Sequence, residues 1–68
     1  MNKKIELVSD GLLTVRDAEL FTGVGKSKIY ALMSDGTLPY CKIGSCRRIP
    51  RRALELFLAG ALVMRDEA

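Results

Sequence analysis

Apolar residues recur at helical spacing in two neighbouring stretches of the chain, residues 14–22 and 25–34. The periodic positions are Val15, Ala18 and Phe21 in the first stretch and Ile29, Leu32 and Met33 in the second. Spacings of three and four residues place side chains on one face of a helix, so each stretch predicts an amphipathic helix with a buried stripe.

Cap residues mark the ends of both predicted helices. Thr14 can cap the first helix, with Asp17 three residues later as the acid of a capping box, and Gly23 can end it in a left-handed conformation. Gly25 can begin the second helix, and Gly36 can follow its end. So short a glycine-containing turn between two helices is typical of a helix-turn-helix.

A hairpin is predicted after the second helix. Pro39 stops that helix, and the extended segments 40–43 and 46–49 flank Gly44-Ser45, whose glycine suits the first position of a type II′ turn. Because an isolated hairpin is unstable in water, this candidate wing has to lean on the helices.

A third helix is predicted from Pro50, a residue that a first helical turn tolerates. Its apolar positions are Ala53, Leu54, Phe57, Leu58 and Leu62. At the other end of the chain, residues 5–8 are expected to form a short extended piece that Asp10-Gly11 terminates.

The length allows one domain. We divide the chain into an N-terminal arm (1–11), a winged helix-turn-helix DNA-binding domain (12–60) and a C-terminal tail (61–68). The expected fold class is mainly α with a small β-hairpin: an α+β winged helix-turn-helix with three helices and one hairpin.

Composition excludes several classes of protein. With 49% apolar residues, the 68-residue chain can pack a globule, and it has no apolar run long enough to cross a bilayer. Two cysteines fit a reducing cytoplasm better than a disulfide-rich secreted domain. Without histidine, the chain lacks the most usual general base and the ligands for a zinc site. We therefore expect no enzyme activity, no catalytic residue, no cofactor or metal, and no small-molecule substrate.

Positive charge is concentrated in one part of the chain. The net charge is only +3, but the segment from Lys42 to Arg52 holds five basic residues and no acidic one. Such a one-sided basic surface indicates a polyanionic partner, and double-stranded DNA fits it. The alternative is a solvated basic face without a partner.

The second predicted helix has cations at the unfavourable end. Lys26 and Lys28 lie in its first turn, where they oppose the helix dipole. A phosphate docked at that end would reverse the penalty and use the unpaired backbone N–H groups. Ser27 could then reach a base edge or a phosphate, whereas the ring of Tyr30 is equally compatible with the core and with a phosphate contact. The alternative is that the lysines simply lie on an exposed face.

The hairpin carries Lys42 on one strand and Arg47 and Arg48 on the other. Neighbouring strand residues face opposite ways, so only one of the two arginines can point at a DNA groove. The alternative is a charged edge strand that prevents aggregation. Cys41 and Cys46 are diagonal neighbours across this hairpin, too far apart for a disulfide, and are expected to be small buried or half-buried residues.

The order of these short motifs resembles excisionase-type helix-turn-helix domains. The matching motifs are Leu12-Leu13-Thr14-Val15-Arg16-Asp17-Ala18, Gly23-Val24, Lys26-Ser27-x-Ile29-Tyr30-x-Leu32, Gly36-x-Leu38-Pro39, Lys42-Ile43-Gly44, Arg48-Ile49-Pro50-Arg51 and Ala53-Leu54-x-x-Phe57-Leu58. They cover residues 12–58. This sequence departs from the family pattern with Gly25 in place of a capping serine and Arg47 in place of a frequent wing aromatic.

The resemblance implies a MerR-like winged helix, in which the second helix enters the major groove and the wing contacts the adjacent minor groove or backbone. The residues expected to contact DNA are Lys26, Ser27, Lys28 and Tyr30 in the recognition helix, Lys42, Arg47 and Arg48 in the wing, and Arg51 and Arg52 at the backbone from the start of the third helix.

The implied function is that of an excisionase, a recombination directionality factor that binds DNA as an architectural protein and assists an integrase in excising a mobile element. A phage-encoded or bacterial protein, cytoplasmic and nucleoid-associated, is expected, with an integrase and self-association on DNA as further partners and no membrane. One alternative is a small transcriptional regulator. Another is a protein-interaction module that pairs two copies or docks an integrase through Leu56, Leu62, Val63 and Met64.

Overall fold

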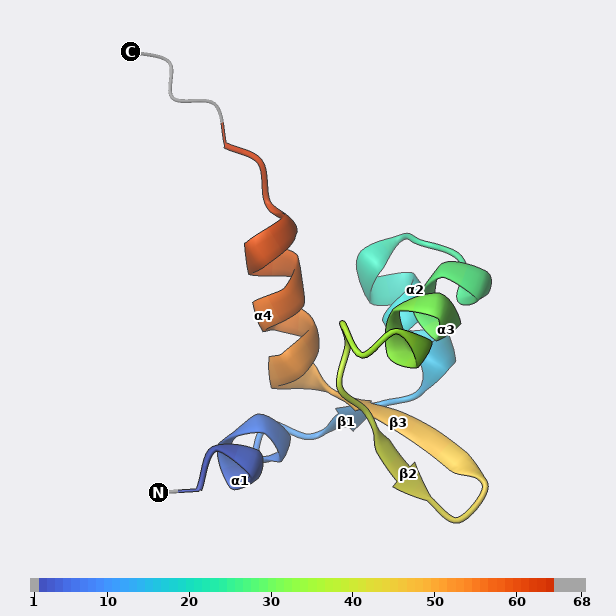
Figure 1. The fold of residues 1–68 in the computed structure, drawn as a ribbon, viewed down its shortest axis with the longest axis vertical. Coiled ribbons are helices and arrows are strands. Elements are labelled where there is room, and N and C mark those ends of the chain that lie inside the picture. The colour runs from blue at the N-terminus through green and yellow to red at the C-terminus, as the bar shows by residue number, and fades with distance from the viewer. Residues whose placement is uncertain (1, 65–68) are drawn as a thin grey trace.

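Four helices pack about one end of a small antiparallel sheet, whose β2–β3 hairpin projects away from them, in the computed structural model, which describes residues 2–64 (Figure 1). In chain order the elements are α1 (Lys3–Val8), β1 (Leu12–Leu13), α2 (Val15–Thr22), α3 (Lys26–Ser34), β2 (Cys41–Ile43), β3 (Cys46–Pro50) and α4 (Arg51–Ala61). The strand order in the sheet is β1-β3-β2. This architecture confirms the expected mainly α, α+β winged helix-turn-helix, with one more helix and one more strand than the sequence analysis proposed.

Strand β3 is shared between the wing and the helical body. On one edge it pairs with β2, where Ile43 opposes Cys46 across the turn. On the other edge it pairs with β1, where Leu13 opposes Ile49. Gly44 takes the left-handed φ of 62° that the first position of a type II′ turn requires, so the predicted hairpin register is confirmed.

The core joins segments that are distant in the sequence. Its largest fully buried side chains are Ile29 of α3, Leu38 of the following loop, Ile49 of β3 and Leu54 of α4. Ala18 of α2 is also fully buried in the same cluster. One continuous apolar cluster therefore fixes the positions of α2, α3 and α4 around β3.

The predicted helix ends of α2 and α3 are confirmed. The hydroxyl of Thr14 accepts from the backbone N–H of Asp17 at 2.9 Å, and the Asp17 carboxylate accepts from the Thr14 N–H at 3.4 Å, which completes the capping box. Gly23 and Gly36 adopt the left-handed φ values of 76° and 84° that end α2 and α3.

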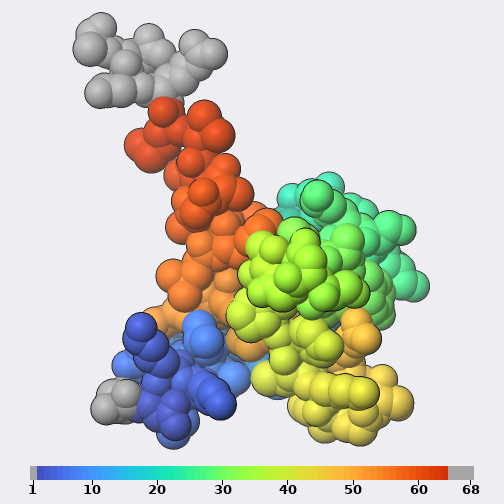
Figure 2. Space-filling view, viewed as in Figure 1, coloured from blue at the N-terminus to red at the C-terminus, as the bar shows by residue number. Residues whose placement is uncertain are grey.

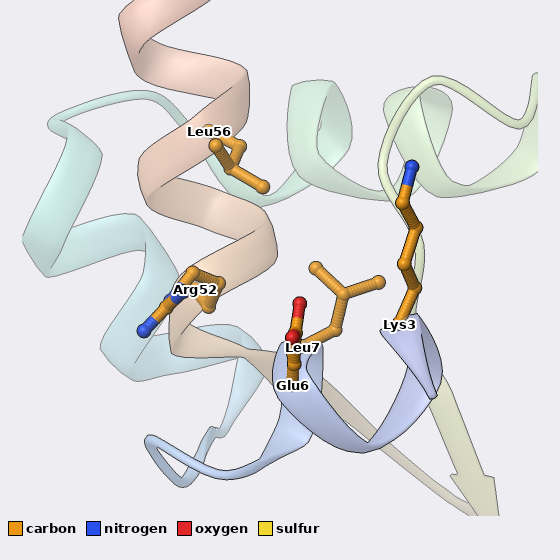
Figure 3. Close-up of a pocket in the computed structure, with 5 residues that line it drawn as sticks. All are labelled: Lys3, Glu6, Leu7, Arg52 and Leu56. Carbon is orange, nitrogen blue, oxygen red and sulfur yellow. The ribbon is translucent and has the colours of Figure 1, made fainter. Parts of the chain in front are cut away.

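The expected extended piece at residues 5–8 is wrong, because these residues lie within helix α1. The Asn2 side chain caps this helix by accepting from the backbone N–H of Lys4 at 2.8 Å. So short a helix is not stable alone, and α4 supplies the surface against which α1 packs. Leu7 and Leu56 help to line a groove between the two helices (Figure 3).

Two expectations about burial are corrected. Phe21 is 44% exposed rather than part of a buried stripe, because α2 turns this position toward the guanidinium of Arg51, 5.8 Å from the ring centroid. Cys46 is exposed rather than buried or half-buried, because the end of the wing extends beyond the core, whereas Cys41 is half-buried as expected. Both thiols are free, as the diagonal register predicts.

The core assignment can be tested with two leucines of one helix. Leu54→Ala removes a fully buried side chain and is expected to lower the free energy of unfolding by about 2–5 kcal/mol. Leu56→Ala, at a position 59% exposed, is the matched control and should change it far less. Urea unfolding followed by circular dichroism measures both; equal losses would contradict this core.

Candidate nucleic-acid interface

The N-terminal end of α3 is open to solvent. Gly25 takes the cap position with extended backbone (φ −73°, ψ 165°), and no side chain caps the helix. Lys26, Ser27 and Lys28 follow in the first turn, and all three are exposed. The end of α3 thus presents free first-turn N–H groups beside two ammonium groups, whereas α2 begins with a closed capping box.

The burial of one α3 face orients the other. Ile29, Leu32 and Met33 pack into the core. At 100° per residue this leaves Ser27 and Ala31 on the outer face, where both are exposed. Because both side chains are small, the outer face of α3 can approach another surface closely.

An acidic residue lies near the lysines of α3. Hydrogen bonds from the side chain and the backbone N–H of Thr37 lower the pKa of Asp35, and the positive charge of Lys28 acts in the same direction. The Thr37 N–H donates to Asp35 Oδ1 at 2.8 Å. Asp35 is thus ionised at neutral pH and attracts the ammonium group of Lys28.

Arg47 bridges the wing and α3. Its guanidinium carbon lies 5.4 Å from the ring centroid of Tyr30 in α3 and 5.0 Å from that of Tyr40, just before β2. Tyr30 itself is half-buried and packs against the core. Both distances are within the range of cation–π attraction, so the guanidinium is held by two rings.

The other two wing cations lie on opposite faces of the hairpin. Lys42 opposes Arg47 in the ladder and therefore shares its face, where Lys42 is exposed. Arg48 points to the other face, is half-buried, and donates from Nη1 to the carbonyl of Arg47 at 2.9 Å. Lys42 is thus the exposed wing cation on the side of α3.

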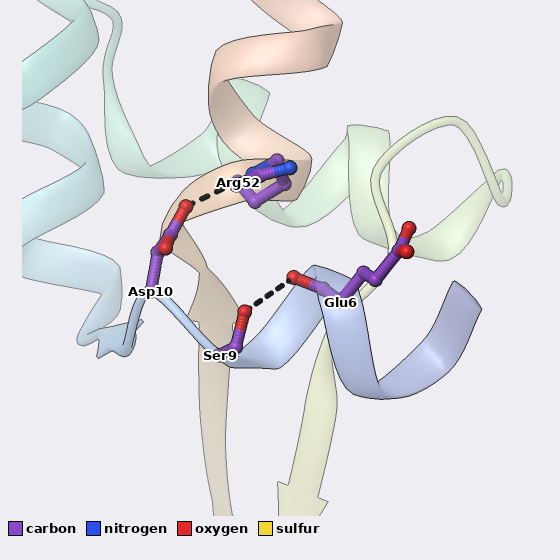
Figure 4. A network of polar contacts seen from close by, with 4 residues as sticks. All are labelled: Glu6, Ser9, Asp10 and Arg52. Carbon is purple, nitrogen blue, oxygen red and sulfur yellow. Dashed lines mark hydrogen bonds and ion pairs between the residues drawn. The ribbon is translucent and has the colours of Figure 1, made fainter. Parts of the chain in front are cut away.

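The two arginines at the start of α4 both have intramolecular partners. Arg51 lies over Phe21, as described above. Arg52 Nε donates to Asp10 Oδ2 at 2.9 Å, in an ion pair whose members are both partly exposed (Figure 4). The hydrogen bond to Asp10 and its charge raise the pKa of Arg52. Contact of these two residues with DNA stays a prediction.

The elements expected to form the interface lie together. Figure 1 shows α3 and the β2–β3 hairpin on the right of the molecule, with α1 and α4 on the left. In the space-filling view these two elements form separate lobes on that same side (Figure 2). Contacts join Arg47 of the wing to Tyr30 of α3, and Lys42 shares the face of Arg47, whereas Arg48 lies on the opposite face of the hairpin and Arg52 pairs with Asp10.

Tyr40 is a residue of this site that the sequence analysis missed. Counting back from the Gly44-Ser45 turn places it on the face of Lys42 and Arg47, diagonal to the arginine. Aromatic side chains reach diagonal neighbours, so the predicted register already contained this signal.

Among residues 2–64, no helix is long and apolar enough to span a membrane, and no group of His, Cys, Asp or Glu side chains is arranged to hold a metal ion.

A family model described as a helix-turn-helix domain matches residues 12–61. The chain belongs to this helix-turn-helix family. It is also similar to a "Probable excisionase" of Saccharopolyspora erythraea, with 39% identity over 57 residues, or 84% of this chain. These residues span 58% of that relative, so the chain covers less than two-thirds of its length. No solved structure matches the chain. The resemblance to excisionase-type helix-turn-helix domains, a DNA-binding class, is confirmed.

Asp35 offers a test of the electrostatics at this site. Asp35→Asn keeps an oxygen to accept the Thr37 N–H but removes the charge that attracts Lys28. We expect a few-fold gain in affinity for duplex DNA at low salt, measured by fluorescence anisotropy, that fades as salt is raised. Glu55→Gln on α4 removes the same charge elsewhere and is the control; an equal gain from both variants would contradict a local effect.

Proposed function

We propose that the chain binds double-stranded DNA with α3 in the major groove and the β2–β3 wing on the adjacent minor groove or backbone. The observation that carries this proposal is the uncapped, lysine-bearing end of α3 on the same side as the basic wing. Membership of a helix-turn-helix family supports it independently.

The end of α3 is suited to a phosphate. Its unpaired first-turn N–H groups and the positive end of the helix dipole both favour an anion. Lys26 and Lys28 destabilise this helix end while no anion is bound, and the attraction of both ammonium groups to a bound phosphate outweighs their repulsion by the helix dipole. Ser27 and Ala31, short side chains on the outer face, let the helix approach base edges closely, and Ala31 can contact a thymine methyl group.

The wing supplies a second anchoring point. Lys42 is exposed on the face that the hairpin shares with α3, which makes it the wing residue best placed for a backbone phosphate. Phosphate contacts from two separate elements fix the register of a protein on the duplex, whereas base contacts give specificity.

The salt dependence of binding tests the α3 contacts. In Lys26→Ala/Lys28→Ala the slope of log affinity against log salt should fall by about 2, because each neutralised phosphate contributes roughly 0.9. The matched control is Lys3→Ala/Lys4→Ala, which removes the same charge from α1. Anisotropy titrations of a labelled duplex at several salt concentrations measure both; equal losses of slope would contradict an α3-centred interface.

Within DNA binding, we propose the role of an excisionase, supported by the similarity to the Saccharopolyspora erythraea protein. An excisionase places itself on DNA beside an attachment site and helps an integrase to excise the element. This role needs a surface for a partner as well as one for DNA.

The far end of α4 is the candidate for that partner surface. Leu62, Val63 and Met64, which follow the last residue of α4, are 65%, 88% and 79% exposed, and Leu56 within α4 is 59% exposed. Adjacent exposed apolar side chains, such as Leu62, Val63 and Met64, are typical of protein-interaction sites. We propose that an integrase, or a neighbouring copy on the same DNA, docks there.

An excision assay separates the excisionase role from that of a transcriptional regulator. A plasmid carrying the attachment sites of the element, its integrase and the wild-type chain should yield more excised product than integrase alone. Lys26→Ala/Lys28→Ala should abolish the stimulation, and Leu62→Ser/Val63→Ser should lower it while DNA affinity is kept. Specific DNA binding without any stimulation would favour the regulator.

A further inference from the structure

We propose that Arg47 is a positioning residue that clamps the wing to the recognition helix, rather than a DNA contact. This role rests on the proposed DNA binding. Arg47 contacts two tyrosines of the protein itself, and Lys42, on the same face of the hairpin, is left to contact a phosphate.

Two aromatic rings flank the guanidinium of Arg47. The Arg47 carbon Cζ lies 5.4 Å from the Tyr30 centroid and 5.0 Å from the Tyr40 centroid. Tyr30 belongs to α3, and Tyr40 leads into the wing. A flat, delocalised cation stacks well on aromatic faces, so one side chain joins the helix to both strands of the hairpin.

Strand β3 carries Arg47 on the face that leads into the core. Ile49, two residues after Arg47 and therefore on the same face, is fully buried in the core. The face that carries Arg47 thus continues the core outward toward the wing, and Arg47 is half-buried there. Arg48 adds support from the other face, since its Nη1 donates to the Arg47 carbonyl at 2.9 Å.

The end of the wing is exposed to solvent. Past Tyr40 and Cys41 the exposed residues of the hairpin are Lys42, Ile43, Gly44, Ser45 and Cys46. A two-stranded hairpin is marginally stable on its own, so its angle to α3 depends on contacts near its base. The stack of Arg47 on Tyr30 is such a contact, and it joins the wing to the recognition helix.

A clamp of this kind fixes the distance between the two DNA-contacting elements before DNA arrives. Ordering a loop on binding costs affinity, and a loop that is ordered beforehand avoids that cost. We therefore expect Arg47 to affect affinity through the geometry of the free protein, without adding a phosphate contact.

The test compares three substitutions whose rank differs between the two roles. Arg47→Phe keeps a flat group between the tyrosines but loses the charge, Arg47→Lys keeps the charge but loses the plane, and Arg47→Ala loses both. For a clamp we expect Phe to retain the affinity for duplex DNA best and Ala to weaken it by roughly tenfold, with the salt slope unchanged in all three. For a phosphate contact, Lys would retain affinity best, and Phe and Ala alike would lose about 0.9 from the slope, which would overturn the proposal.

Lys42→Ala is the matched control on the same face of the wing. It should lower the salt slope by about 0.9 and leave the tyrosine environment unchanged. The chain has two tyrosines and no tryptophan, so near-ultraviolet circular dichroism of tyrosine reports on the Arg47 cluster alone. If Arg47→Ala fails to fold, the order of the Phe and Lys variants still decides.

A direct measurement does not depend on DNA affinity. Proton NMR of the free protein should show the Arg47 Hδ resonances shifted upfield by the ring currents of Tyr30 and Tyr40, and the shift should persist when duplex DNA is added. An unshifted resonance, or one that loses its shift on DNA binding, would overturn the clamp. Failure of the wild-type protein to bind any duplex would instead refute the proposed function, while the upfield shift in the free protein would still establish the stack.

Discussion

The pairing of β3 with two partners is the constraint on which the fold depends. On one edge β3 carries the wing strand β2, and on the other it holds the two-residue strand β1, with Ile49 fully buried between α2, α3 and α4. A hairpin alone is marginal in water, and so is a helix of six residues. Because β3 enters the core directly before α4, the packing of this one strand positions both the wing and α4.

The two helices of the helix-turn-helix motif differ in how their N-termini are capped. Thr14 and Asp17 satisfy the start of α2 with a capping box, whereas Gly25 leaves the start of α3 without a side-chain cap. A serine cap would stabilise α3 but would occupy the N–H groups that an anion can use. The uncapped end makes α3 less stable but leaves its N–H groups available to a phosphate. The negative charge of Asp35 partly offsets the positive charge of Lys28 nearby.

Most of the basic residues in and after the wing fall into two groups: arginines that contact another side chain of the protein, and a lysine that is exposed to solvent. Arg47, Arg51 and Arg52 each have an intramolecular partner: a pair of tyrosines, a phenylalanine and an aspartate. Lys42, with its compact and strongly hydrated ammonium, stays exposed. Arginine is the better cation for stacking and for paired hydrogen bonds, so the division follows the chemistry of the two side chains.

Local sequence patterns determine much of this structure. The two amphipathic helices, their caps and the hairpin register follow from spacing and turn chemistry, which act over a few residues, and these were predicted correctly, as was the helix-turn-helix class. Helix α1 and strand β1 were not, because a six-residue helix and a two-residue strand gain their stability from α4 and β3, partners about forty to fifty residues away in the sequence. The contact of Arg47 with Tyr40 follows from the hairpin register, but its contact with Tyr30 and the pairing of Arg52 with Asp10 do not. The sequence shows which residues are cationic, whereas tertiary packing brings a ring or a carboxylate beside each one and so decides which cations stay exposed.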